Sequence, residues 1–176
     1  MEKNRIFLLF NGSSLYVYWW VSFWGASNNN FYVGPVLAIT YFVFHFCVIS
    51  NKKKELHYML FCILFGLFLE SLFYYTSFLD YRGIVTQKYS IIPFWILILW
   101  AGYSLTVFHS FRWIYGRYYL SVILGGLFAP LIYLSGHRIG CIILNYDILT
   151  SYLVLAPIWS LSFLLLNYFS VRINEK

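Results

Sequence analysis

Apolar segments of membrane-crossing length are the feature that most constrains this chain. About 20 apolar residues cross a hydrocarbon core of ~30 Å at a rise of ~1.5 Å per residue. By that measure the sequence has six candidate spans, at about residues 6–26, 32–50, 57–79, 91–113, 118–136 and 148–170. We therefore expect an all-α fold, a polytopic membrane bundle of six transmembrane helices that forms one domain over residues 1–176.

The composition agrees with a lipid environment. Hydrophobic residues make up 61% of the chain, aromatic residues 24% and charged residues only 10%, which lies outside the range of soluble globular proteins. The net charge of +6 comes from short patches between apolar segments, without the continuous basic face that nucleic-acid binding requires. We therefore expect membrane lipids as partners, and no nucleic acid.

The span at 91–113 has recognisable ends. Pro93 fits the first turn of a helix, Trp95 follows at the depth of an aromatic belt, and Arg112 closes the other end. One stripe at helical spacing gathers small and polar groups and should face protein. Its members are Trp95, Gly102, Thr106, His109 and Trp113.

The distribution of positive charge predicts an orientation, because cytoplasmic segments are enriched in Lys and Arg. With six spans, nine of the 12 cationic residues fall on one side: Lys3, Arg5, Lys52, Lys53, Lys54, Arg112, Arg117, Arg172 and Lys176. Arg82, Lys88 and Arg138 fall on the other. We expect both termini to lie in the cytoplasm.

Small residues recur at every fourth position of the fifth span, at Ser121, Gly125 and Ala129. This spacing lets helix backbones approach closely. It would serve contacts within one chain or between two copies, so a homo-oligomer is one expected partner. Pro130 should kink this helix, and Pro157 lies near the middle of the sixth span.

Glu70 is the ionisable residue that most needs an explanation, because a carboxyl inside a span is costly and is by default a functional-site candidate. Its helix face also carries Gly66, Tyr74 and Ser77. Arg138, at the outer end of the fifth span, is the expected cationic partner. The carboxyl either holds helices together or takes part in ligand binding or proton transfer.

Polar groups near Glu70 supply the ingredients of acid–base chemistry on a lipid-borne substrate. The catalytic candidates are Glu70, His137 and Arg138, and the ligand-binding candidates are Glu70, Ser71, Tyr74, His109, Arg112 and Arg138. Towards the cytoplasmic side, His109, Ser110 and Arg112 could bind a lipid phosphate, with bidentate bonds from the arginine. Alternatively, Arg112 only snorkels beside an interfacial histidine.

No metal or cofactor is expected. His45, His57 and His109 could converge with Cys47 and Cys62, but no two of these histidines share a span at the i, i+3 or i, i+4 spacing on which metal sites in bundles rest. The cysteines occur singly and suit a structural role. The sequence also lacks G-x-S-x-G, H-E-x-x-H and a phosphate-binding glycine loop.

Four motifs between Gly66 and Gly140 carry a resemblance. They are G-x-x-x-E-S at Gly66, Glu70 and Ser71; P-x-W-x-x-x-L-W at Pro93, Trp95, Leu99 and Trp100; T-x-x-H-S with a later Trp at Thr106, His109, Ser110 and Trp113; and G-x-x-x-P-x-x-Y-x-x-G-x-x-x-G at Gly126, Pro130, Tyr133, Gly136 and Gly140. With them the chain resembles a family of small bacterial inner-membrane proteins known only as a domain of unknown function. The family more often has Asp at the position of Glu70 and Asn at that of Phe108.

Members of that family are often encoded near enzymes that modify membrane fatty acids, including cyclopropane-type synthases. The resemblance therefore implies a lipid-related or envelope role in the bacterial inner membrane, and no particular reaction. Our first hypothesis is a multi-pass protein that binds lipid or a lipid-modifying partner enzyme. The second is a membrane enzyme acting on a lipid, with Glu70 as acid or base and Arg138 as anion clamp. The third is a small transporter whose helices, broken near Pro130 and Pro157, surround a midplane site.

Overall fold

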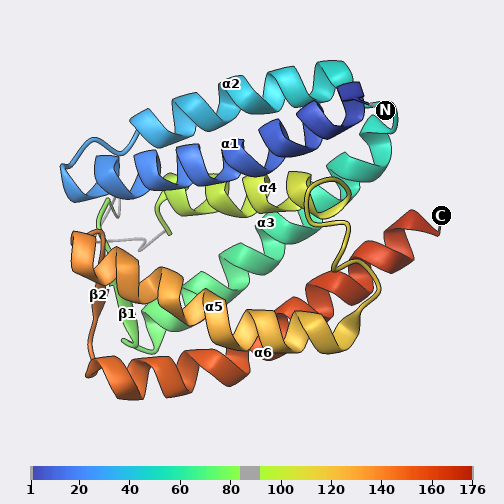
Figure 1. The fold of residues 1–176 in the computed structure, drawn as a ribbon. Coiled ribbons are helices and arrows are strands. Elements are labelled where there is room, and N and C mark those ends of the chain that lie inside the picture. Colours follow the sequence, from blue (N-terminus) through green and yellow to red (C-terminus); the bar gives the residue numbers. More distant parts are fainter. Residues whose placement is uncertain (1, 84–91, 176) are drawn as a thin grey trace.

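The computed structural model describes residues 2–83 and 92–175, which form six α-helices and one pair of short strands (Figure 1). The expected all-α class is confirmed. In chain order the elements are α1 (Glu2–Ser27), α2 (Val33–Val48), α3 (Lys52–Tyr75), β1 (Leu79–Tyr81), α4 (Phe94–Val107), α5 (Tyr118–Ile139), β2 (Ile142–Leu144) and α6 (Ile148–Asn174).

Successive helices run in opposite directions (Figure 1). Because there are six described helices, both termini lie at the same end of the bundle. At this end the Lys54 ammonium, at the start of α3, lies 2.8 Å from Asn174 Oδ1, at the end of α6. We call it the terminal end; it also holds residues 108–117. The opposite end, with β1 and β2, is the strand end.

Four helices, α1, α3, α5 and α6, are long and apolar enough to cross a membrane. The other two are apolar but shorter, with 16 residues in α2 and 14 in α4. Both sequences were expected to continue: the second span to residue 50 and the fourth to residue 113. A helix forms in each of the six expected segments, but only four of these helices have the length of a full membrane span.

The largest departure from the sequence-based expectation is the end of α4. The helix stops at Val107, and residues 108–116 form successive turns. Side chains from other helices hold this segment: Glu55 bonds to His109, and the backbone N–H of Ser110 donates to Asn11 Oδ1 at 3.3 Å. These tertiary bonds override a sequence that would otherwise continue as helix. Trp113 is consequently 53% exposed, whereas the first three residues of its expected stripe are buried.

Other boundaries differ by about one turn. Helix α3 already begins at Lys52, so the lysine patch lies in its first turn, and it ends before Ser77. Helix α5 continues through His137 and Arg138, and Gly140 closes it in the left-handed conformation at φ 85°. Both α5 and α6 continue through their prolines, so the expectation of helices broken there was wrong.

The two strands were not predicted from the sequence, because each has only three residues between helices. They pair antiparallel, with Leu79 opposite Leu144. His137, in the last turn of α5, accepts a hydrogen bond from the Leu144 N–H at 3.3 Å. The pair thereby joins the chain just after α3 to the chain just before α6.

The core is built around α4, in which ten of the 14 residues are buried. The small-residue stripe of α5 is also used within the chain, where it packs against α6. A Cβ atom on Gly125 would lie only 2.5 Å from the backbone oxygen of Trp159. Ser121 and Ala129, one turn to either side, are buried as well.

Candidate functional site

A connected group of buried polar side chains lies at the terminal end, where three elements meet. His45 comes from the last turn of α2, Glu55 from the first turn of α3, and His109 from the segment after α4. The Glu55 carboxylate lies between the two imidazoles, with its Oε2 2.7 Å from His45 Nε2 and its Oε1 2.8 Å from His109 Nε2. The side chains of His45, Glu55 and His109 are 0%, 4% and 20% exposed.

Hydrogen bonds extend this group into a continuous line that we call the polar chain. His45 Nδ1 lies 3.2 Å from the Tyr41 hydroxyl, and that hydroxyl accepts a 2.6 Å hydrogen bond from Asn11 Nδ2. The Asn11 carbonyl oxygen then accepts from the Ser110 hydroxyl at 2.7 Å. In order, the members are Ser110, Asn11, Tyr41, His45, Glu55 and His109.

The polar chain fixes where its protons lie. The Ser110 backbone N–H can only donate, so Asn11 must present its oxygen to Ser110 and its amide nitrogen to Tyr41. The Tyr41 oxygen therefore accepts, and its own hydrogen is free to donate to His45 Nδ1. A neutral His45 then carries its proton on Nε2 and donates it to Glu55. Every member of the polar chain has a hydrogen-bond partner, as buried polar groups require.

Sequence reasoning found part of this group. It placed His45 and His109 on one side of the membrane, but it grouped them with His57 and two cysteines. His57 is exposed and bonds to the Lys53 backbone oxygen, at 2.6 Å. Glu55 was missed, because it follows three lysines. A usable signal was present: His45 and Glu55 are each five residues from Ser50 in the α2–α3 connection, so they face each other across the turn.

Glu70 occupies a second buried polar group, near the strand end. Its Oε2 accepts from the Tyr81 hydroxyl at 2.5 Å, and its Oε1 accepts from Trp100 Nε1 at 3.0 Å and from the Tyr133 hydroxyl at 2.8 Å. The residue is 3% exposed. Arg138 is exposed, and no ion pair joins it to Glu70 in the described part of the chain. The expected Glu70–Arg138 pair is therefore not formed, because neutral donors occupy both carboxyl oxygens.

The donors around Glu70 come from three elements besides α3, namely β1, α4 and α5. Burial raises the pKa of Tyr81 well above its ordinary value, and the neighbouring Glu70 carboxyl raises it further. The phenol consequently stays protonated and remains a donor. Glu70 thus has a complete structural explanation as the junction of four elements.

The other candidate residues lie apart from these groups. Ser71 and Tyr74 are half-buried on α3, with the Tyr74 ring 5.6 Å from that of Tyr75. His137 bonds to β2, as described above, and Arg112 is exposed. Among the described residues, no hydrogen bond or ion pair joins Glu70, His137 and Arg138 into one acid–base group.

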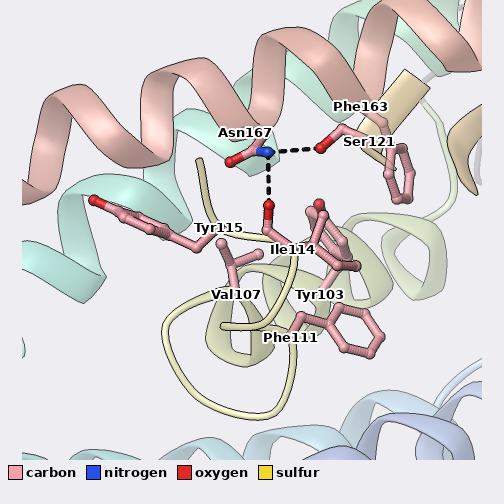
Figure 2. A pocket seen from close by; sticks show the side chains of 8 residues that line it. All are labelled: Tyr103, Val107, Phe111, Ile114, Tyr115, Ser121, Phe163 and Asn167. Carbon is pink, nitrogen blue, oxygen red and sulfur yellow. Dashed lines mark hydrogen bonds between the residues drawn. The ribbon is translucent and has the colours of Figure 1, made fainter. Parts of the chain in front are cut away.

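A small cavity lies between α4, α5 and α6 (Figure 2). Asn167 lines this cavity. The Asn167 amide donates to the Ser121 hydroxyl at 2.6 Å and to the Ile114 backbone oxygen at 3.0 Å. The cavity measures about 20 Å³, room for about one water molecule and too little for a lipid chain. A shallower groove of about 340 Å³ runs along α1, lined by Leu8, Leu9, Gly12, Ser13, Tyr16 and Ser110.

The chain matches one family of known proteins. Residues 8–165 match the family described as protein of unknown function (DUF2878). The chain belongs to this family. The resemblance seen in the motifs to a family of unknown function is thereby confirmed, and the matched range contains both buried polar groups. No curated protein and no solved structure matches the chain.

Proposed function

We propose that this chain is a six-span protein of the bacterial inner membrane with both termini in the cytoplasm. It binds anionic lipid at its terminal end and acts as a partner of envelope-lipid-modifying enzymes, without chemistry of its own. The observation that carries the proposal is the gathering of exposed cationic and aromatic side chains at one end of a bundle whose outer surface is apolar.

The polarity of the bundle is inverted relative to a soluble protein, which supports lipid as its surroundings. Large apolar side chains are more than half exposed along the helices, for example Leu60 and Phe68 on α3 and Leu153 and Leu161 on α6. Polar side chains are buried instead, including Asn11, His45, Glu55, Glu70, Thr106, Ser121, Ser151 and Asn167.

The two short helices can cross as well. Helix α2 is about 24 Å long and α4 about 21 Å at the ordinary helical rise, less than the hydrocarbon thickness. Because α4 is surrounded by other helices, its non-helical ends lie against protein, where irregular backbone is tolerated at membrane depth. Helix α2 needs only modest bilayer thinning.

The terminal end has the features of a cytoplasmic membrane interface. Lys52, Lys53, Arg112 and Arg117 are exposed there, together with Trp113, between the two arginines, and Tyr119, in the first turn of α5. Arg82 and Arg138 lie at the strand end, and Lys88 lies outside the described residues. This asymmetry supports the orientation that the sequence predicts.

Cysteine labelling tests the orientation. Trp113 and Tyr146 are both 53% exposed, but they lie at opposite ends of the bundle. With the exposed Cys47 changed to Ser, we expect a membrane-impermeant maleimide to label Tyr146→Cys in intact cells. It should label Trp113→Cys only after the cells are lysed. Labelling of both variants, or the reverse pattern, would contradict the proposed topology.

Lipid binding is tested by native mass spectrometry of protein titrated with phosphatidylglycerol in mild detergent. The double variant Arg112→Gln/Arg117→Gln should bind it roughly 30-fold more weakly, since each cation near anionic headgroups contributes about 1 kcal/mol. The matched control is Arg82→Gln/Arg138→Gln, which removes two arginines from the strand end. An equal loss of lipid affinity in both double variants, or no loss in either, would contradict a lipid site at the terminal end.

Neither alternative function has a specific observation in its favour. A lipid enzyme that used Glu70 as acid or base would need that carboxyl open to substrate, yet it is sealed by three donors. The transporter hypothesis rested on helices interrupted at Pro130 and Pro157, and both helices are continuous.

A further inference from the structure

We propose that His45, Glu55 and His109 bind one divalent transition-metal ion of the zinc type. This goes beyond the proposed lipid-associated function and does not depend on it. Two imidazole nitrogens and one carboxylate supply three ligands, and a fourth position stays open, as in catalytic His₂Glu zinc sites. The sequence-based expectation of no metal arose because the three ligands come from three different elements.

The geometry needs little adjustment. The potential ligand atoms of the three residues all lie within 4.8 Å of one another. Around a tetrahedral zinc ion with bonds of about 2.1 Å, neighbouring ligand atoms lie about 3.4 Å apart. The present N–O separations are 2.7 Å to Glu55 Oε2 and 2.8 Å to Glu55 Oε1, and they need to open by about 0.7 and 0.6 Å, within reach of side-chain rotation.

The surroundings of the three residues match those of a metal site. The Tyr41 hydroxyl lies against His45 Nδ1, where metal-binding histidines have their orienting partner. A hydroxyl oxygen can accept two hydrogen bonds, so Tyr41 can accept one from His45 Nδ1–H as well as the one from Asn11 when Nε2 binds the metal. The Phe7 ring packs 5.2 Å from the His109 ring and 5.9 Å from the His45 ring, which gives the site an apolar cover.

The lysines that precede Glu55 do not occupy the site. The Lys54 ammonium bonds to Asn174 at 2.8 Å and lies 4.5 Å from the centre of the Phe108 ring. Lys52 and Lys53 are exposed. The mixture of nitrogen and oxygen ligands selects zinc, iron(II) or cobalt(II) over calcium and magnesium, which prefer oxygen alone.

Metal titration of the full chain in detergent tests the proposal. Wild-type protein that is stripped with EDTA and then incubated with Zn²⁺ should retain one Zn²⁺ per chain through desalting, measured by elemental mass spectrometry. Saturating Zn²⁺ should raise the melting temperature by roughly 5 °C. Co²⁺ should give the intense visible absorption of a four-coordinate ion with nitrogen and oxygen ligands.

Variants locate the ion. Glu55→Gln keeps the size of the side chain but removes the charged ligand. Zinc affinity should fall by more than ~100-fold, a larger loss than follows when a residue that only orients a metal ligand is changed. His109→Ala, at the more exposed edge, provides a second test should Glu55→Gln fail to fold. The control is His57→Gln, which changes an exposed histidine on α3, the helix of Glu55. This variant should bind zinc as tightly as the wild type does.

Two results would overturn the inference. One is folded wild-type protein that binds neither Zn²⁺ nor Co²⁺ at micromolar concentration, and the other is unchanged zinc stoichiometry in both Glu55→Gln and His109→Ala. Cysteine labelling and phosphatidylglycerol titration use other residues, so a negative metal result leaves the proposed function standing.

Discussion

Replacing Glu70 by leucine is expected to lower the free energy of unfolding by roughly 4 kcal/mol. Leucine has a similar volume but accepts no hydrogen bonds, so the Tyr81 and Tyr133 hydroxyls and the Trp100 indole N–H lose their common acceptor. Each unpaired buried donor costs about 1–3 kcal/mol, offset in part by the removal of a buried carboxyl. Unfolding in mixed detergent–SDS micelles measures the change.

The matched control is Glu70→Gln, which keeps one carbonyl oxygen for Trp100 and Tyr133. Only the bond from Tyr81 must reverse its direction, and we expect a loss of about 1 kcal/mol. Equal stability of the leucine and glutamine variants would show that the carboxyl does not hold the four elements together. It would return Glu70 to the ligand-binding or proton-transfer role considered from the sequence.

Replacing Gly125 by alanine is expected to cost roughly 2–3 kcal/mol, at the upper end of overpacking effects. The added methyl group would lie 2.5 Å from the Trp159 backbone oxygen and 2.8 Å from Phe163 Cβ. Neither atom can move away by a side-chain rotation, so α6 itself must shift from α5. The same micelle unfolding assay applies.

Gly126→Ala provides the comparison within the same helix turn. There the added methyl group meets chiefly the Ser160 hydroxyl, which can rotate at the expense of its 3.0 Å bond to the Val122 backbone oxygen. We expect a loss of about 1 kcal/mol, the ordinary value of one hydrogen bond. Similar losses at both positions would mean that close backbone approach at Gly125 is not what holds α5 to α6.

The helices were predictable because apolar length and small-residue spacing are local properties of the sequence. The end of α4 was not, since the bonds that stop it come from Asn11 and Glu55, far away in the chain. Nothing in the apolar sequence of residues 91–113 indicates that the carboxylate of Glu55, 54 residues away, will form a hydrogen bond with His109.

The candidate sites were predictable only in part, for a similar reason. Glu70 was recognised from its place in an apolar helix, but its partners were not. Trp100 and Tyr133 stand in the motifs that carry the family resemblance, yet as aromatic residues they suggest packing before hydrogen bonding. Arg138 was the electrostatic expectation, and three neutral donors serve the carboxyl instead. Glu55 was hidden by the neighbouring lysines.

The arrangement around Glu70 has a consequence for the biosynthesis of the protein. The ribosome makes Glu70 30 residues before Trp100 and 63 residues before Tyr133. When α3 enters the membrane, Tyr133, which lies two helices further along the chain, is not yet in place beside the Glu70 carboxyl. The polar atoms of α3 must therefore be sheltered by water or by the insertion machinery, and the bundle can close only once its fifth helix has arrived.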